Sequence, residues 1–140
     1  MNAPGYVGDL TPQQAWQLLA QDPDAVLVDV RTHAEWAYVG GPDISSLGRS
    51  HLALEWQTFP DGRPNAAFVE QLRDRLGNHR GPVVMLCRSG VRSVAAAQAA
   101  TAAGLGPAFN VLEGFEGGLD PAGHRGHEGW RAAGLPWRQG

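Results

Sequence analysis

Short apolar runs and segments with helical spacing alternate along the chain. Three runs are apolar and rich in β-branched residues, which is typical of strands buried on both faces of a sheet. They cover residues 25–30, 81–86 and 108–114. A fourth segment, residues 51–56, places Leu52, Leu54 and Trp56 on one side and also predicts a strand.

Apolar residues at helical spacing fill the intervals between these runs. The predicted helices cover residues 10–21, 32–39, 66–77 and 91–104. Thr11 and Thr32 each open a Thr-x-x-Gln/Glu capping box, Asn65 is a candidate cap for the third helix, and Gly77 and Gly104 end the third and fourth. Residues 114–120 are expected to hold one helical turn, and residues 130–137 a short turn or helix.

Alternation of strands with helices predicts the fold class. Right-handed strand–helix–strand crossovers give an α/β fold with a mostly parallel central sheet and helices on both faces. A length of 140 residues suits one domain with one core, and no repeat or linker interrupts the pattern. We therefore expect a single domain over residues 1–140, with its core in roughly residues 10–135.

Composition and charge exclude several classes of function. The net charge of −3 gives no general attraction to nucleic acid or to anionic lipid, so neither is expected as a partner. A single cysteine cannot form an internal disulfide. The first ten residues lack the features of a signal peptide, and no apolar run approaches the roughly 20 residues of a membrane span. A cytoplasmic protein is the expectation.

Polar residues follow three of the predicted strands. Asp29 and Arg31 come at the end of the first strand, Cys87 at the end of the central one, and Glu113 at the end of the third. In open parallel sheets, ligands bind beyond the carboxyl ends of the strands. The sequence therefore predicts that Cys87 lies at the functional edge of the sheet.

The segment CRSGVRS, residues 87–93, joins a predicted strand to a predicted helix. Gly90 permits backbone angles that other residues avoid, so the loop can turn successive N–H groups inward around an anion. The start of the helix adds the positive end of its dipole. A free cysteine after an apolar strand is often a small buried hydrophobe. The glycine, the flanking Arg88 and Arg92, and the helix start favour a nucleophilic thiolate instead.

With these residues in place, the chain resembles a rhodanese (thiosulfate sulfurtransferase) domain of the single-domain type. VLVDVRTHAEW resembles the Asp-x-Arg-x-x-x-Glu segment of that family, and VVMLCRSGVRS resembles its active-site strand, loop and helix. FNVLEGFEGG and WRAAGLPW resemble the segments that follow. One departure is the longer stretch over residues 38–50, which replaces a compact Gly-His-Ile-Pro-Gly-Ala segment; His51 resembles a remnant of it and has no assigned role.

The resemblance implies sulfur transfer through a persulfide on Cys87. Backbone N–H groups of the next five residues would cradle the sulfur, namely Arg88, Ser89, Gly90, Val91 and Arg92. Ser93 would cap the helix or donate its hydroxyl, with capping the favoured role. The partners implied are a small-molecule sulfur donor such as thiosulfate and a thiol, cyanide or protein acceptor. No cofactor and no metal is implied.

Three further residues are predicted to support the loop. Arg92 needs a carboxylate partner, for which Asp29 and Glu35 are the candidates. Arg31 could reach the pocket or pair with Glu35, and a structural role is favoured.

The two histidines of residues 123–130 are expected to be exposed, because a metal site would need more ligands than that loop offers.

Two other functions remain open at this point. Cysteine-loop phosphatases and arsenate reductases place five residues between the cysteine and an arginine, whereas four separate Cys87 from Arg92. That shorter loop favours a single sulfur atom over a tetrahedral oxyanion. A non-catalytic rhodanese-like module that binds a partner or senses redox state through an exposed thiol is the second alternative.

Overall fold

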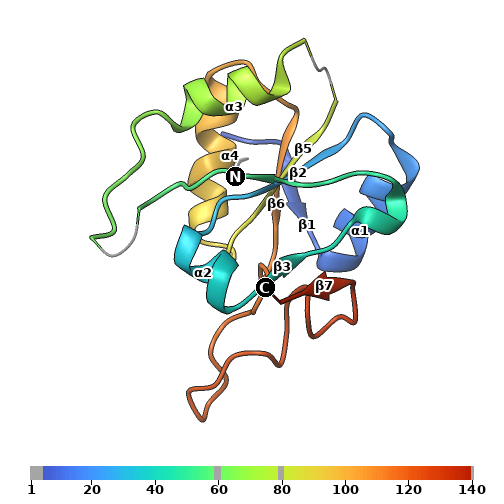
Figure 1. Ribbon diagram of the computed structural model, residues 1–140, viewed down its shortest axis with the longest axis vertical. Helices are drawn as coiled ribbons and strands as arrows, with labels where there is room; N and C mark the ends of the chain where they lie inside the picture. Colours follow the sequence, from blue (N-terminus) through green and yellow to red (C-terminus); the bar gives the residue numbers. More distant parts are fainter. Residues whose placement is uncertain (1–4, 59–60, 79–80, 140) are drawn as a thin grey trace.

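A computed structural model describes residues 5–58, 61–78 and 81–139 of the chain (Figure 1). Five parallel strands form the central sheet in the order β1-β6-β5-β2-β4. Their bounds are β1 Gly8–Leu10, β2 Val26–Asp29, β4 Leu52–Ala53, β5 Val83–Leu86 and β6 Ala108–Val111. A second, antiparallel pair joins β3, Gly41–Pro42, to β7, Trp137–Arg138.

Helices cover both faces of the sheet, as the sequence predicts (Figure 1). They are α1 Pro12–Gln21, α2 His33–Tyr38, α3 Phe68–Leu76 and α4 Arg92–Ala102, with a short 3-10 turn at Ser45–Leu47. Val83, Met85 and Cys87 of the β5 segment pack with α3 and α4 on one face. Val84 and Leu86 point to the opposite face and pack with α1. This alternation follows from the pleat of a strand.

Each helix begins and ends within two residues of its predicted range, but the predicted cap of α3 is absent. Both predicted capping boxes are present, at Thr11 and at Thr32, and Gly77 ends α3 with a positive φ. Asn65 does not cap α3, because its side-chain oxygen accepts the N–H of Ala67 and closes a turn before the helix begins. The helix then starts one residue beyond Ala67, without a side-chain cap.

The strand predictions were wrong mainly at the edges of the sheet. The predicted strand over 51–56 shortens to Leu52–Ala53, and the strand over 108–114 ends at Val111, because the chain there turns across the sheet edge. Residues 114–116 form a turn and residues 117–120 have no regular secondary structure, so the predicted helical turn is absent. Strands β1, β3 and β7 were not predicted; each has two or three residues, too few to show an alternating pattern.

Candidate active site

Three adjacent strands bring the predicted residues to one edge of the sheet. In the parallel register, Asp29 of β2 lies opposite Leu86 of β5, and Asn110 of β6 lies opposite Met85. The segments that continue from Asp29, Leu86 and Val111 therefore leave the sheet side by side. The prediction that these three strand ends meet is confirmed.

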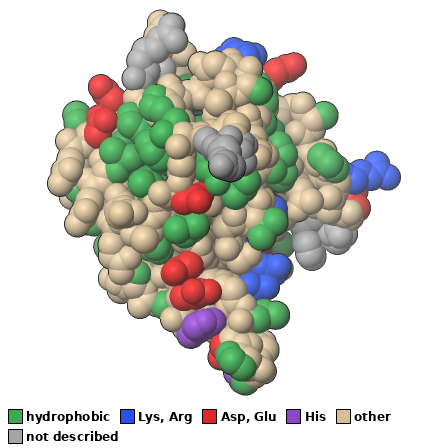
Figure 2. Space-filling model, turned by 180° about the vertical axis from the view of Figure 1, so that it is seen from behind, with side chains coloured by type: hydrophobic (Ala, Val, Ile, Leu, Met, Phe, Trp, Pro, Cys, Tyr) green, Lys and Arg blue, Asp and Glu red, His purple; other side chains and the backbone are tan. Residues whose placement is uncertain are grey.

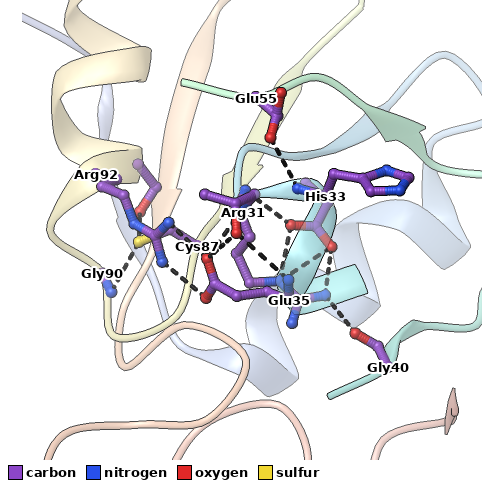
Figure 3. A network of polar contacts seen from close by, with 11 residues as sticks. Arg31, His33, Glu35, Gly40, Glu55, Cys87, Gly90 and Arg92 are labelled. Atoms are coloured by element: carbon purple, nitrogen blue, oxygen red, sulfur yellow. Dashed lines mark hydrogen bonds and ion pairs between the residues drawn. The ribbon is translucent and has the colours of Figure 1, made fainter. Parts of the chain in front are cut away.

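Cys87 is buried, with 1% of its surface exposed, yet its sulfur contacts two polar groups. The N–H of Gly90 donates to Sγ at 3.1 Å (Figure 3). Ser93 Oγ also lies 3.1 Å from Sγ. Gly90 has φ +99°, which is the left-handed backbone region that glycine permits. This turn brings the Gly90 N–H back toward the sulfur and lets α4 begin at Arg92.

Fewer backbone N–H groups contact the Cys87 sulfur than the five that the resemblance implied. Within the described part of the chain, Gly90 supplies the one backbone N–H that is hydrogen-bonded to Sγ. Arg88 is exposed, Ser89 is half-buried, and the side chain of Val91 is 73% exposed at the N-cap of α4. Arg88, Ser89 and Val91 thus lie on the outer side of the loop.

Ser93 does not cap α4, contrary to the favoured expectation. It is the second residue of the helix and is fully buried, while Val91 occupies the N-cap without a side-chain bond. The Ser93 hydroxyl donates to Asn110 Oδ1 and faces the sulfur of Cys87. No pattern in the sequence pointed to Asn110, because an asparagine inside a buried strand belongs to no local motif.

Backbone groups from the segment after β6 hold the loop carbonyls. Phe115 N–H donates to the Cys87 carbonyl at 2.7 Å, and the N–H groups of Glu116 and Gly117 donate to the Arg88 carbonyl at 2.9 and 3.1 Å. The chain can approach this closely because Gly114 has φ +62°; a Cβ there would lie 2.5 Å from the Cys87 carbonyl oxygen. Sequence reasoning missed this support, and only the glycine-rich string EGFEGG could have indicated it.

Arg92 pairs with Glu35, one of its two predicted partners. Its NH1 and NH2 groups donate to Oε1 and Oε2 of Glu35 at 2.7 and 3.0 Å (Figure 3). Burial tends to raise the pKa of Glu35, but the bonds from Arg92 and Thr32 outweigh it and lower that pKa from 4.5 to about 2. The pair fixes the start of α4 against α2, and both ends of the Arg92 guanidinium are engaged.

Asp29 and Arg31 pair with each other, so neither the Asp29–Arg92 nor the Arg31–Glu35 pairing occurs. Arg31 Nε and NH2 donate to the Asp29 carboxylate at 2.9 and 2.6 Å, and NH2 also donates to the Gly40 carbonyl. Both side chains are fully buried, and the Arg31 guanidinium lies 4.3 Å from the centre of the Phe115 ring. Asp29 and Arg31 are two residues apart at the end of one strand, so their side chains reach each other more easily than either reaches a residue of another element.

Two cavities lie near this edge. One, of about 370 Å³, adjoins the outer side of the Cys87 loop and is lined by Arg88 and Arg92 together with Thr32, Glu35, Gln57 and Thr58. The other, of about 310 Å³, is lined largely by the inserted stretch and contains Trp36, Arg49, His51 and Arg138. Burial lowers the pKa of His51, with Arg31 adding to the effect and Asp29 and Asp43 opposing it. The site therefore disfavours the protonated form of His51 at the wall of the second cavity.

The histidines of the loop before Trp130 are exposed, as predicted. His124 lies at the surface, and the His127 side chain is 47% exposed with Nε2 4.0 Å from Glu128 Oε1. Figure 2 shows histidine at the surface of the lower end of the molecule. Over residues 5–58, 61–78 and 81–139, no group of three or more His, Cys, Asp or Glu side chains could hold a metal ion. In the same residues no helix has the length and apolarity to cross a membrane.

A family model and known proteins match most of the chain. The family model of the STR4 middle domain matches residues 7–140. A crystal structure of Rv0390 from M. tuberculosis is 60% identical, covers 96% of this chain and 99% of that chain, and superposes with a TM-score of 0.90. An uncharacterized protein of Rickettsia rickettsii, the RP600 homolog, is 33% identical over 94% of this chain and 98% of its own.

Two more distant similarities bear on activity and on fold. The thiosulfate sulfurtransferase GlpE of Haemophilus influenzae is 28% identical over 78% of this chain and 85% of its own length. The structure of RPA3614 from Rhodopseudomonas palustris CGA009, described as a possible tyrosine phosphatase, is 22% identical. It covers 94% of this chain and 85% of its own with a TM-score of 0.51, and this similarity concerns the fold alone.

Proposed function

The chain belongs to the rhodanese-like family, in which it matches the STR4 middle domain, and from this premise we propose that it is a sulfurtransferase that carries sulfur on Cys87. The observation that carries the proposal is the position of the Cys87 sulfur. It lies 3.1 Å from the N–H of Gly90, two residues before the first residue of an 11-residue helix, on the functional edge of a parallel sheet. An N–H donor and a helix N-terminus both stabilise a thiolate.

The reaction proceeds in two steps. Cys87 loses its proton to solvent, and its thiolate attacks the outer sulfur of thiosulfate. A new S–S bond forms while the S–S bond of thiosulfate breaks, and sulfite leaves with the electron pair. A thiolate or cyanide acceptor then attacks the outer sulfur of the persulfide, which returns the Cys87 thiolate. The Gly90 N–H keeps the sulfur positioned through both steps.

The 370 Å³ cavity beside the loop is the proposed donor site. The charged residues that line it are Arg88, Arg92 and Glu35. Because Glu35 neutralises Arg92, the exposed Arg88 leaves the cavity with a net positive charge. A small dianion such as thiosulfate suits that charge, and its approach along Arg88 would bring it to the loop that holds Cys87.

One observation weighs against each alternative function. A phosphatase of the cysteine-loop type needs its arginine directed at the oxyanion, whereas both ends of the Arg92 guanidinium are bound to Glu35. A redox sensor that closes an internal disulfide needs a resolving cysteine, whereas Cys87 is the single cysteine of the sequence.

Intact-mass measurement after incubation with thiosulfate tests the proposal. We expect a gain of one sulfur atom that a thiol reductant or cyanide removes, with thiocyanate formed in the cyanide case. Cys87 is the single cysteine of the chain, so Cys87→Ser should show no gain under the same conditions. Absence of any gain with thiosulfate and with polysulfide would refute the proposal. Faster turnover of an aryl phosphate than of thiosulfate would support a phosphatase instead.

A further inference from the structure

A chain of buried polar side chains runs from the Cys87 sulfur to the first strand of the sheet. Sγ contacts Ser93 Oγ at 3.1 Å, and the Ser93 hydroxyl donates to Asn110 Oδ1. Asn110 Nδ2 then donates to Asp9 Oδ1 at 3.0 Å, where the Tyr6 hydroxyl also donates at 2.7 Å. Ser93 is fully buried and Asn110 is 2% exposed, so neither side chain can turn to water for a replacement bond.

The carboxylate at the end of this chain fixes the direction of every bond in it. An ionised carboxylate can only accept, so Asp9 requires the NH₂ group of Asn110 on its side. The amide oxygen of Asn110 then faces Ser93 and requires the Ser93 hydroxyl proton. Ser93 has one hydroxyl proton, so its oxygen presents a lone pair to Cys87.

We propose that Asp9 is a positioning residue that, through Asn110 and Ser93, holds the proton on the Cys87 thiol. With a lone pair toward the sulfur, Ser93 accepts the S–H of Cys87 and offers nothing to the thiolate. To donate to a thiolate, Ser93 must withdraw its proton from Asn110, which leaves a buried amide oxygen unpaired. The proposal rests on the proposed function, in which the thiolate is the attacking species.

Other charged groups face the same loop and act differently on it. The positive charge of Arg92 attracts a Cys87 thiolate, and Glu35 neutralises that positive charge. Asp29 and Arg31 form their own buried pair, and the Glu113 carboxylate accepts from the Gly129 N–H. Within the described residues, Asp9 is the ionisable group that connects to Sγ through side-chain hydrogen bonds. Arg88 is exposed on the loop, and the Tyr6 hydroxyl donates to Asp9.

The pH profile of Cys87 alkylation by iodoacetamide tests the proposal in Asp9→Asn. An asparagine at position 9 can donate as well as accept, so Asn110 is free to reverse and Ser93 to donate to the sulfur. We expect the midpoint of the alkylation profile to move to lower pH by about half to one unit, which is about three- to tenfold faster alkylation below both midpoints. Asp9 is exposed, so this variant should fold.

Two further variants separate the hydrogen-bond chain from a simple loss of charge. Ser93→Ala removes the acceptor of the thiol proton and should also lower the midpoint; a higher midpoint would mean that Ser93 donates to the thiolate and would overturn the proposal. In the Ser93→Ala background, Asp9→Asn should have no further effect, whereas a through-space effect of charge would persist. Tyr6→Phe, which leaves the Asn110 bond in place, should keep the parent midpoint.

The midpoint of the alkylation profile can be measured whether or not the protein transfers sulfur. If thiosulfate adds no sulfur but the Asp9→Asn midpoint still moves, the proposed function fails and the hydrogen-bond chain stands. If sulfur is added normally while the Asp9→Asn midpoint equals that of the parent, the inference about Asp9 is wrong and the proposed function stands.

Discussion

Replacing Glu35 with Gln should remove the ion pair to Arg92 while keeping the cap of α2. The Glu35 Oε1 atom accepts from both Thr32 N–H and Arg92, and a glutamine oxygen can still accept the Thr32 N–H in a capping box. Arg92 would then remain partly buried, with its side chain 18% exposed and no carboxylate. The loss of stability in Glu35→Gln therefore measures the Glu35–Arg92 ion pair alone, whereas Glu35→Ala would also remove the cap of α2.

The pKa of Glu35 sets the size of the expected loss in unfolding free energy. Its fall from 4.5 to about 2, against the opposing effect of burial, corresponds to at most about 3–4 kcal/mol at about 1.4 kcal/mol per pH unit. Partial exposure of both side chains reduces this to about 1–3 kcal/mol. Since the unfolded chain takes up the proton at higher pH than the folded chain, the contribution is fully present above pH 4.5 and is lost as the pH falls toward 2.

Urea unfolding measures the difference in unfolding free energy between the parent protein and Glu35→Gln. The comparison is made at neutral pH and at several lower pH values, down to the most acidic pH at which the protein still folds. The gap should be about 1–3 kcal/mol at neutral pH and should narrow below pH 4.5. Asp61→Asn is the control at an exposed ion pair. Hydrogen bonds from Thr58 and Arg63 lower the pKa of Asp61 as well, but solvent screens this pair, so the loss should be much smaller than that in Glu35→Gln. Equal stabilities at neutral pH, or a gap that stays constant down to acid, would refute the assignment.

Three other substitutions address the loop support, the donor site and the second cavity. Gly114→Ala should destabilise by more than about 3 kcal/mol in thermal unfolding, because of its φ of +62° and the Cys87 carbonyl 2.5 Å away, whereas Gly48→Ala, at φ +76° with open space, should cost about 1 kcal/mol. Arg88→Ala should raise KM for thiosulfate by up to about fivefold with kcat little changed, less so at high salt; an unchanged KM would place the donor elsewhere. Since the pKa of His51 is lowered in the fold, stability should fall as the pH drops below 6.5, and His51→Gln should flatten that part of the stability–pH curve; equal slopes would contradict the burial of His51.

The predictable parts of the site were those with a local signal. The β-branched run before Cys87, the glycine three residues after it and the helix that follows are adjacent in sequence, so the Cys87–Gly90 contact could be predicted. The Glu35–Arg92 pair was predicted as one of two options through a family pattern. Roles that depend on segments distant in the chain were predicted less well, as the Ser93 assignment shows.

The unpredicted contacts join residues far apart in sequence. Asn110 is 17 residues from Ser93 and 101 from Asp9, and no local pattern marks such a connection. Similarly, the carbonyl of Cys87 is held by the N–H of Phe115, a backbone group that is the same in every residue. Sequence patterns report on neighbours along the chain, whereas these bonds depend on how neighbouring strands lie in register.

The sequence by itself determined the fold class, the edge at which Cys87 lies and the chemistry that its loop allows. Those follow from the periodicity of side chains and from backbone freedom at Gly90, which act over a few residues. The tertiary structure alone decided which carboxylate binds Arg92, that Asp29 binds Arg31, and which way the Ser93 hydroxyl points. Each of these choices depends on distances between side chains on different elements, and those distances exist only once β2, β5 and β6 are packed side by side.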